Sequence, residues 1–172
     1  GIAESVADED YLGDKEWARN LFQKSEDLAE DSSDYSSIAD LVAGEDYLGD
    51  KKYAKALYQK AEDLAEDLSD YNSIAESVAD EDYLGDKEWA GNLLQKSEDL
   101  ADDPSYYCSI ADLVAGEEYL GDKKYAKALY QKAEDLAEDL SDYNSIAESV
   151  ADEDYLGDKE WEGEGRERRE RG

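Results

Sequence analysis

The stretch GDKKYAKALYQKAEDL at residues 49–64 decides the fold of this chain. Its apolar residues recur at steps of three and four, which is the spacing of one face of an α-helix. A glycine and an aspartate precede that face, as expected for a turn whose aspartate caps the helix that follows. We therefore predict an amphipathic helix, helix B, whose apolar face consists of Tyr53, Ala54, Leu57, Tyr58, Ala61, Leu64, Ala65 and Leu68.

This helix belongs to a block of 36 residues that recurs along the chain. The blocks begin at Ile2, Ile38, Ile74, Ile110 and Ile146. The third block resembles the first, and the fourth matches the second except at Asp46 and Glu118, so the order alternates. The predicted repeats are 2–37, 38–73, 74–109, 110–145 and a partial repeat, 146–161. We call the first, third and fifth blocks odd repeats and the second and fourth even repeats.

Each block also contains an earlier helix, helix A. In the third block we expect Ser69 or Asp70 to cap it and Gly85 to end it, since glycine accepts the left-handed conformation. Asp86 then caps helix B, which we expect to continue to about Asp103. The predicted apolar face of helix A consists of Tyr71, Ile74, Ala75, Val78, Ala79 and Tyr83.

A single hairpin of this size cannot bury both of its helices, so we expect neighbouring hairpins to stack. The chain is then an all-α protein of tandem helix-turn-helix repeats, with one domain at 1–161 and a disordered charged tail at 162–172. The first and last helices lack a neighbour on one side. We therefore expect both ends, including Ile2, Ile146 and Val150, to expose apolar surface that could drive end-to-end packing.

Helix B resembles that of a tetratricopeptide repeat (TPR). Ala54 and Tyr58 form an Ala-x3-aromatic step, and Ala61 follows it. The step recurs at Ala18-x3-Phe22, Ala90-x3-Leu94 and Ala126-x3-Tyr130. The resemblance covers most of 1–161 and implies a right-handed α-solenoid, or superhelix. Helix A departs from the family, since its Trp-x2-Leu-Gly-x2-Tyr pattern is absent and the period exceeds the usual value of about 34.

In TPR proteins, helix A lines a groove that receives extended peptides. The resemblance places three rows of residues in that groove, namely Asn72, Cys108 and Asn144, then Asp46, Asp82 and Glu118, then Tyr47, Tyr83 and Tyr119. On a helical wheel, Asp82 falls within the apolar sector of helix A. Carboxylates beside aromatic rings suit a Lys- or Arg-containing peptide. Alternatively, these acids pair locally with a tyrosine hydroxyl or with backbone amides of the next helix.

Differences between the first and third blocks suggest a second candidate site. They introduce Gly91, Leu94, Pro104, Tyr106 and Cys108, which we interpret as a variable contact patch. Alternatively, these differences arose by sequence drift, or Cys108 is a thiol that was introduced for labelling. Trp17, Trp89 and Trp161 begin helix B in the odd repeats, and we expect them to anchor the core.

The composition excludes several classes of function. A net charge of −31 disfavours nucleic acid binding, which needs a basic surface. Without histidine, a serine or cysteine nucleophile lacks its usual base, so we expect no enzyme. We expect no cofactor or metal and, without an apolar run of about 18 residues, no membrane segment. A single cysteine fits a reducing compartment, and we expect a cytoplasmic protein.

We therefore expect a non-catalytic helical-repeat scaffold for binding a protein or peptide, possibly a basic one. The near-identical repeats and the lack of methionine are typical of a designed protein, although recent gene duplication would also give such repeats. One alternative function is a structural module that self-assembles through its ends or through the Cys108 patch. Another is a natural bacterial TPR-like adaptor.

Overall fold

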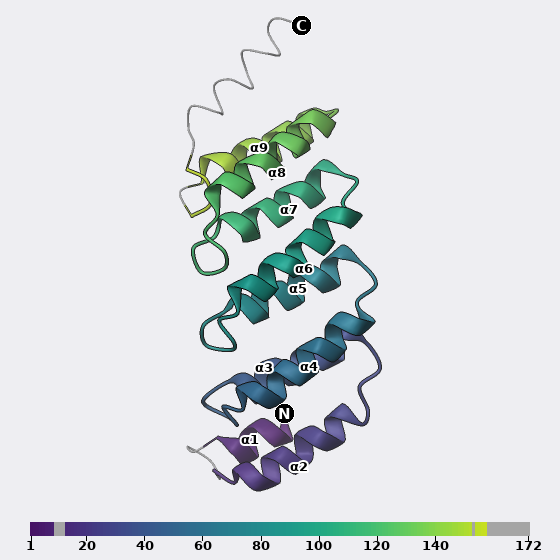
Figure 1. The fold of residues 1–172 in the computed structure, drawn as a ribbon, viewed down its shortest axis with the longest axis vertical. Coiled ribbons are helices and arrows are strands. Elements are labelled where there is room, and N and C mark those ends of the chain that lie inside the picture. The colour runs from purple at the N-terminus through teal and green to yellow at the C-terminus, as the bar shows by residue number, and fades with distance from the viewer. Residues whose placement is uncertain (9–12, 153, 158–172) are drawn as a thin grey trace, which may run out of the picture. The chain divides into compact units, whose positions relative to one another are not determined.

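The chain folds into α-helices joined by short turns (Figure 1). The structure is a computed structural model that describes residues 1–8, 13–152 and 154–157. Within these ranges there are nine helices and no strand, which confirms the all-α prediction. The helices are α1 (Ile2–Ala7), α2 (Lys15–Glu26), α3 (Ser32–Ala43), α4 (Lys51–Leu64), α5 (Leu68–Ala79), α6 (Lys87–Leu100), α7 (Pro104–Ala115), α8 (Lys123–Leu136) and α9 (Leu140–Ala151).

The helices follow the spacing of the sequence blocks. The even-numbered helices correspond to helix B and begin at Lys15, Lys51, Lys87 and Lys123. The chain divides into two compact units, Gly1–Leu93 and Leu94–Gly172, with the boundary inside α6. In the first unit α3 packs against α4 and α5, and in the second α7 packs against α8 and α9. Neighbouring hairpins therefore contact one another within each unit.

Aspartate side chains start the B helices, as predicted. Asp50 accepts a hydrogen bond from the backbone N–H of Tyr53 at 3.0 Å, and Asp86 accepts one from Trp89 at 3.1 Å. Each bond satisfies an N–H group that has no partner within the helix. Helix B of the third repeat ends at Leu100, three residues before the predicted end.

The boundaries of helix A differ from the prediction. Asp67 caps α5, two residues before Ser69, and α5 ends at Ala79. Gly85 adopts the predicted left-handed conformation, with φ of 65°, but it lies in the turn beyond the helix. That turn is closed by hydrogen bonds from the N–H of Gly85 to the carbonyl of Asp80 and from the N–H of Asp86 to that of Val78. Residues 80–85 therefore form a folded turn and not a last helical turn.

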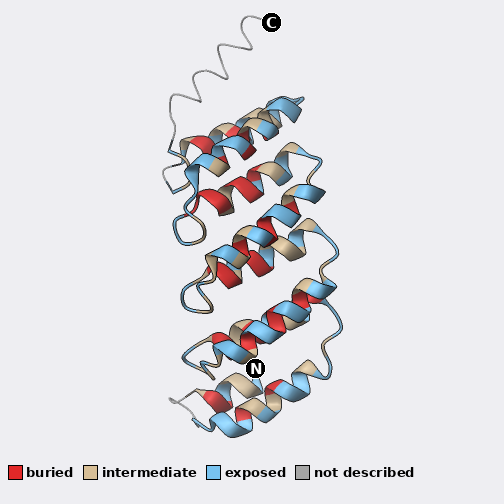
Figure 2. Cartoon of the chain, in the orientation of Figure 1, coloured by how far each residue is buried: buried red, intermediate tan, exposed pale blue. Residues whose placement is uncertain are grey.

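The core lies along the facing sides of the helices in each unit (Figure 2). Leu57 and Tyr58 are fully buried, as the apolar face of helix B predicts. Leu64 is 43% exposed because α4 ends there, so the predicted face extends one turn too far. Trp17 is 50% exposed and Trp89 is half-buried, so the prediction that the tryptophans anchor the core is wrong for Trp17.

The two ends of the array differ. Ile2 is 75% exposed, as expected for an uncovered first helix. Ile146 and Val150 are only 5% and 1% exposed, because α9 packs them against α7 and α8. The expectation that these two side chains are exposed is therefore wrong. Trp161 and the predicted tail at 162–172 lie outside the described residues.

Candidate binding surface

Asp40 lies where three helices of the first unit meet. It projects from α3, and the Tyr58 hydroxyl of α4 donates a hydrogen bond of 2.5 Å to its carboxylate. Burial raises the pKa of Asp40, and hydrogen bonds from Tyr58 and from Ser77 of α5 oppose that rise. The carboxylate thus joins both helices of one even repeat to helix A of the following odd repeat.

The second unit contains a copy of this junction. Tyr130 of α8 donates to the carboxylate of Asp112 on α7, and the Ser149 hydroxyl of α9 lies 3.3 Å from the same carboxylate. Burial raises the pKa of Asp112 as well. Because both even repeats build it, the junction is a property of the contact between an even repeat and the odd repeat that follows.

The turn after α5 brings tyrosines and carboxylates together. Burial raises the pKa of Tyr83, and the charges of Asp40, Asp80 and Asp82 raise it further, as does neighbouring Tyr47. All four groups therefore lie near Tyr83 in the first unit. We call Tyr83, these four residues and Asp46, which directly precedes Tyr47, the acidic turn cluster. Tyr47 and Tyr83 are half-buried, whereas Asp82 is exposed. A partner could therefore reach the Asp82 carboxylate directly and part of each ring from solvent.

The predicted rows of acids and tyrosines lie in turns and not on a helix face. Asp46, Asp82 and Glu118 are all exposed, and Asp82 does not continue the apolar sector of α5. The helical-wheel placement of Asp82 is wrong because the helix ends three residues before it. The half-buried Tyr119 occupies the matching turn after α7.

The third predicted row does not share one environment. Asn72 is half-buried, Asn144 is exposed and Cys108 is 7% exposed. Burial raises the pKa of the Cys108 thiol to about 12, with further contributions from nearby carboxylates. Ser36 has the same position in the first repeat, where its hydroxyl is buried without a hydrogen-bond partner. In α3 and α7 this position therefore faces the protein interior.

The residues of the variable patch also differ in exposure. Leu94 and Cys108 are buried, Gly91 is half-buried and Tyr106 is 43% exposed. Pro104 is the first residue of α7, where its missing N–H costs no hydrogen bond. Tyr106 is thus the one large side chain of this set that is exposed.

A second kind of junction, between an odd repeat and the following even repeat, was not predicted from the sequence. The Tyr53 hydroxyl donates a 2.7 Å hydrogen bond to Glu26, and Lys60 forms an ion pair with the same carboxylate. The Lys60 ammonium also lies 5.5 Å from the centre of the Tyr35 ring. Glu98, Tyr125, Lys132 and Tyr107 repeat this arrangement in the second unit. The same residue types recur at these positions in alternate blocks, and that recurrence was the signal in the sequence that could have predicted the junction.

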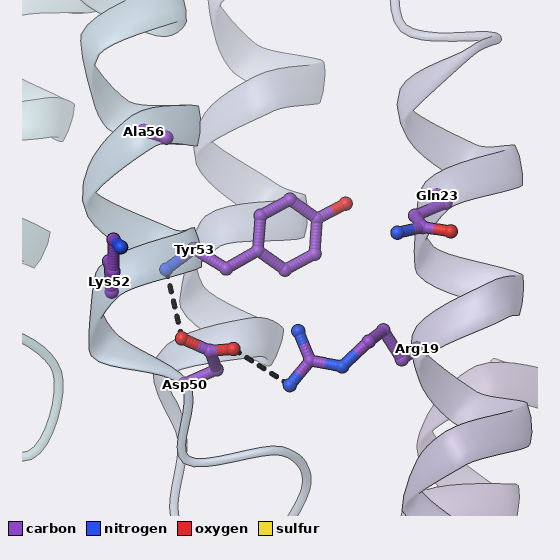
Figure 3. Close-up of a pocket in the computed structure, with 6 residues that line it drawn as sticks. All are labelled: Arg19, Gln23, Asp50, Lys52, Tyr53 and Ala56. Carbon is purple, nitrogen blue, oxygen red and sulfur yellow. Dashed lines mark hydrogen bonds and ion pairs between the residues drawn. The ribbon is translucent and has the colours of Figure 1, made fainter.

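A shallow pocket of about 300 Å³ lies on α2 and α4 (Figure 3). The Arg19 guanidinium forms an ion pair of 2.7 Å with Asp50 and lies 6.0 Å from the centre of the Tyr53 ring. Gln23, Lys52 and Ala56 complete the lining. Asp50 neutralises the arginine and also caps α4. We therefore infer that these contacts hold α2 and α4 together.

No protein-family model matches the chain, and no curated protein or solved structure matches it. In the described part of the chain, no helix has the length and apolar character needed to cross a membrane.

Proposed function

We propose that the chain is a non-catalytic scaffold that binds a protein or peptide through lysine or arginine side chains. The observation that carries this proposal is the acidic turn cluster, in which the Asp80 carboxylate accepts a 2.8 Å hydrogen bond from the N–H of Asp82, and both acids and Tyr47 lie near Tyr83. Carboxylates attract a cation, and the face of an aromatic ring adds a favourable contact with it. The net charge of −31 favours encounter with a basic partner.

The contacts between repeats support this choice of partner, because they use the same chemistry. Lys55 forms a 3.0 Å ion pair with Asp86 and lies 5.3 Å from the centre of the Trp89 ring. Lys60 likewise contacts Glu26 and the Tyr35 ring. A lysine held between a carboxylate and an aromatic ring is thus a recurring contact of this fold, and the acidic turn cluster offers it to an external cation.

The surroundings of the two half-buried carboxylates, Asp40 and Asp112, support a non-catalytic role. Asp40 and Asp112 have raised pKa values, a feature that can mark a catalytic acid. Both nevertheless have the same tyrosine and serine partners, so neither has a distinct environment. Acid-base catalysis by two carboxylates needs environments that separate their pKa values.

We further infer that the array is a TPR-like, right-handed superhelix and that it was designed. The helix B pattern supports the family likeness, since Ala54, Tyr58 and Ala61 are all fully buried. The alternation of near-identical blocks supports a designed origin. A crystal structure would test the handedness, and a left-handed path of successive hairpins would contradict it.

The proposal can be tested by fluorescence anisotropy with a labelled peptide of alternating lysine and glycine. The experiment compares the wild type with Asp46→Asn/Asp82→Asn and with the control Glu30→Gln/Glu66→Gln. All four side chains are exposed, and each double variant removes two negative charges. The control positions lie in the turns that precede α3 and α5, away from the acidic turn cluster.

At about 0.15 M salt, distant charges are screened and contacts at the site dominate. We expect at least about fivefold weaker binding for Asp46→Asn/Asp82→Asn, a loss of about 1 kcal/mol, and less than about twofold for the control. Equal weakening in both would show that the peptide responds only to net charge. That result would contradict the proposed site.

A further inference from the structure

Helix α7 departs from α3, α5 and α9 at its third residue. In those three helices this residue is an aspartate, whose carboxylate accepts a 2.9 Å hydrogen bond from the backbone N–H of the residue four positions earlier. The aspartates are Asp34, Asp70 and Asp142, and the donors are Glu30, Glu66 and Glu138. In α7 the residue is Tyr106, which has no carboxylate. The chain therefore loses a stabilising contact at this position, and such a departure from a repeated local rule is typical of a functional site.

Tyr106 lies at the edge of the second unit where B helices end and A helices begin. The turns from α6 to α7 and from α8 to α9 follow this edge, on the right in Figure 1. Lys132 of α8 forms an ion pair with Glu98 of α6, and its ammonium lies 5.8 Å from the centre of the Tyr107 ring of α7. The ends of α6 and α8 and the start of α7 therefore meet at this edge.

Two leucines are exposed at the same edge. Leu100 and Leu136 are the last residues of α6 and α8, and they are 49% and 44% exposed. Leu136 follows Lys132 by four residues, so it lies one turn further along the same face of α8. We call Leu100, Tyr106 and Leu136 the edge patch. Large apolar side chains that are exposed together, with a tyrosine among them, are typical of a surface that contacts another protein.

The exposure of these leucines is a property of the repeat. Leu64 ends α4 in the first unit as Leu136 ends α8, and it is 43% exposed. The tyrosine distinguishes the second unit, because Asp70 follows Leu64 where Tyr106 follows Leu100. The first unit therefore supplies a matched comparison, with an exposed leucine but no aromatic side chain at the third residue of α3 or α5.

Carboxylates border the edge patch. Residues 98–107 and 132–142 contain nine acidic residues and one basic residue, Lys132, which is already paired with Glu98. The exposed acids are Asp99, Asp102, Asp103, Asp135, Glu138 and Asp139. A second copy of the chain would bring the same negative charge and be repelled, whereas a partner with lysine or arginine would be attracted. The partner must therefore combine apolar side chains with positive charge.

An amphipathic α-helix has this combination. Its apolar residues recur at steps of three and four and form one stripe, with lysines and arginines along both sides of the stripe. The stripe can cover Tyr106 and a leucine while the flanking cations reach the carboxylates around them. An extended chain places successive side chains on opposite faces, so it presents fewer neighbouring apolar side chains to a small patch.

We propose that the edge patch is a docking site for a basic amphipathic helix of another protein, with Tyr106 as its principal contact. This goes beyond the proposed binding at the acidic turn cluster and does not depend on it. The acidic turn cluster lies in the first unit, in turns that lead from helix A to helix B, and takes a cation alone. The edge patch lies at turns from helix B to helix A and needs an apolar face as well.

The proposal is tested by fluorescence anisotropy at about 0.15 M salt with a labelled peptide of leucine and lysine, whose leucines follow helical spacing. Every protein in the series carries Asp46→Asn/Asp82→Asn, which removes the other proposed site. Tyr106→Asp introduces the residue that α3, α5 and α9 have at this position, so the fold accepts it. We expect Tyr106→Asp to weaken binding at least about fivefold, although it adds a negative charge.

Leu136→Ser and Leu64→Ser form a matched pair, because the two leucines have the same position in the repeat and nearly the same exposure. We expect Leu136→Ser to weaken binding at least about threefold and Leu64→Ser less than about twofold. A peptide of the same composition, with its leucines spread around the helix, should bind at least about fivefold more weakly than the amphipathic peptide. Circular dichroism reports whether each variant keeps its helices, and if Tyr106→Asp does not, the leucine pair decides.

Unchanged binding by folded Tyr106→Asp, or equal weakening by the two leucine substitutions, would overturn the proposal, since the peptide would then bind without the tyrosine. Equal binding of the two peptides would overturn it as well, because net charge alone would explain the affinity. Sedimentation equilibrium of the protein alone should give the mass of a monomer. A dimer that Tyr106→Asp dissociates would show that a second copy occupies the patch, and would also overturn the proposal.

Discussion

Replacing Tyr58 by phenylalanine removes one oxygen atom, the hydroxyl oxygen, and so tests the junction at Asp40. Phe22 and Leu94 occupy the same position in odd repeats, so an apolar side chain is compatible with the fold there. Tyr58 is fully buried, and its hydroxyl donates a 2.5 Å hydrogen bond to a half-buried carboxylate. A hydrogen bond to a charged group contributes about 1.5–3 kcal/mol to stability. We expect Tyr58→Phe to lower the free energy of unfolding by about that amount at pH 7.5.

The effect should depend on pH. Burial raises the folded-state pKa of Asp40 above its ordinary value of 3.8, so the folded protein favours the protonated acid. The resulting contribution to stability is present at low pH and is lost as pH rises through the folded-state pKa. Removing the Tyr58 hydroxyl, which stabilises the carboxylate, raises that pKa further. The cost of Tyr58→Phe should therefore shrink as pH falls from 7.5 to about 5, because a protonated Asp40 depends less on the donor.

Urea denaturation followed by circular dichroism measures both effects. Tyr106→Phe is the matched control, because Tyr106 is exposed and its replacement should change stability by less than about 0.5 kcal/mol. Asp40→Asn in the Tyr58→Phe background should restore part of the loss, since an amide is easier to bury than a carboxylate. A cost for Tyr58→Phe no larger than that of Tyr106→Phe at pH 7.5 would refute the account of the junction.

Four further outcomes can be measured on the same protein. Ser36→Ala should raise the free energy of unfolding by about 1 kcal/mol in urea denaturation, because the buried Ser36 hydroxyl has no partner, and a loss of stability would contradict this. The Cys108 thiol, buried and with a pKa raised to about 12, should react with a thiol reagent at neutral pH only after urea unfolds the chain, so fast reaction in the native protein would show that it is accessible. Gly91→Ala in α6 should raise stability by about 1 kcal/mol, since the same position carries Arg19 and Lys55 in other repeats, and an unchanged urea midpoint would count against this. Salt up to about 0.3 M should raise the melting temperature of a protein with a net charge of −31, and a flat or falling response would argue that repulsion does not limit its stability.

The B helices could be predicted because their signals are local. Asp50 precedes Tyr53 by three residues, which is the spacing of an N-cap and the N–H group that it accepts from. The apolar steps that place Leu57 and Tyr58 in the core lie within the same helix. Local spacing was therefore sufficient for these helices, apart from their last turns.

The turns and the junctions depend on contacts that a helical wheel does not contain. Gly85 was assumed to end helix A, but backbone hydrogen bonds close a turn between Asp80 and Gly85 and so move Asp82 off the helix. The bond between Ser77 and Asp40 joins two different repeats, so no single-helix pattern predicts it. Its traces in the sequence are the alternation of Tyr58 with Phe22 and Leu94 and the alternation of Ser77 with Leu41.

The exposure of Trp17 has a similar cause. The sixteen residues that end at Trp17 are identical to those that end at Trp89, yet Trp89 is half-buried beside Glu62 and Tyr58 of the preceding repeat. Burial of this tryptophan thus depends on whether an even repeat precedes it. The local sequence cannot carry that information.

The most direct test of the central claim is to locate a bound basic peptide by nuclear magnetic resonance. Amide signals of the ¹⁵N-labelled protein would be followed during titration with the lysine–glycine peptide at about 0.15 M salt. We predict that the largest shifts fall in the turns at 44–49 and 80–85, which contain Tyr47 and Tyr83, and that Asp46→Asn/Asp82→Asn removes them. Shifts that are largest at 27–31 and 65–67, or equal along the whole chain, would contradict the acidic turn cluster as the binding site.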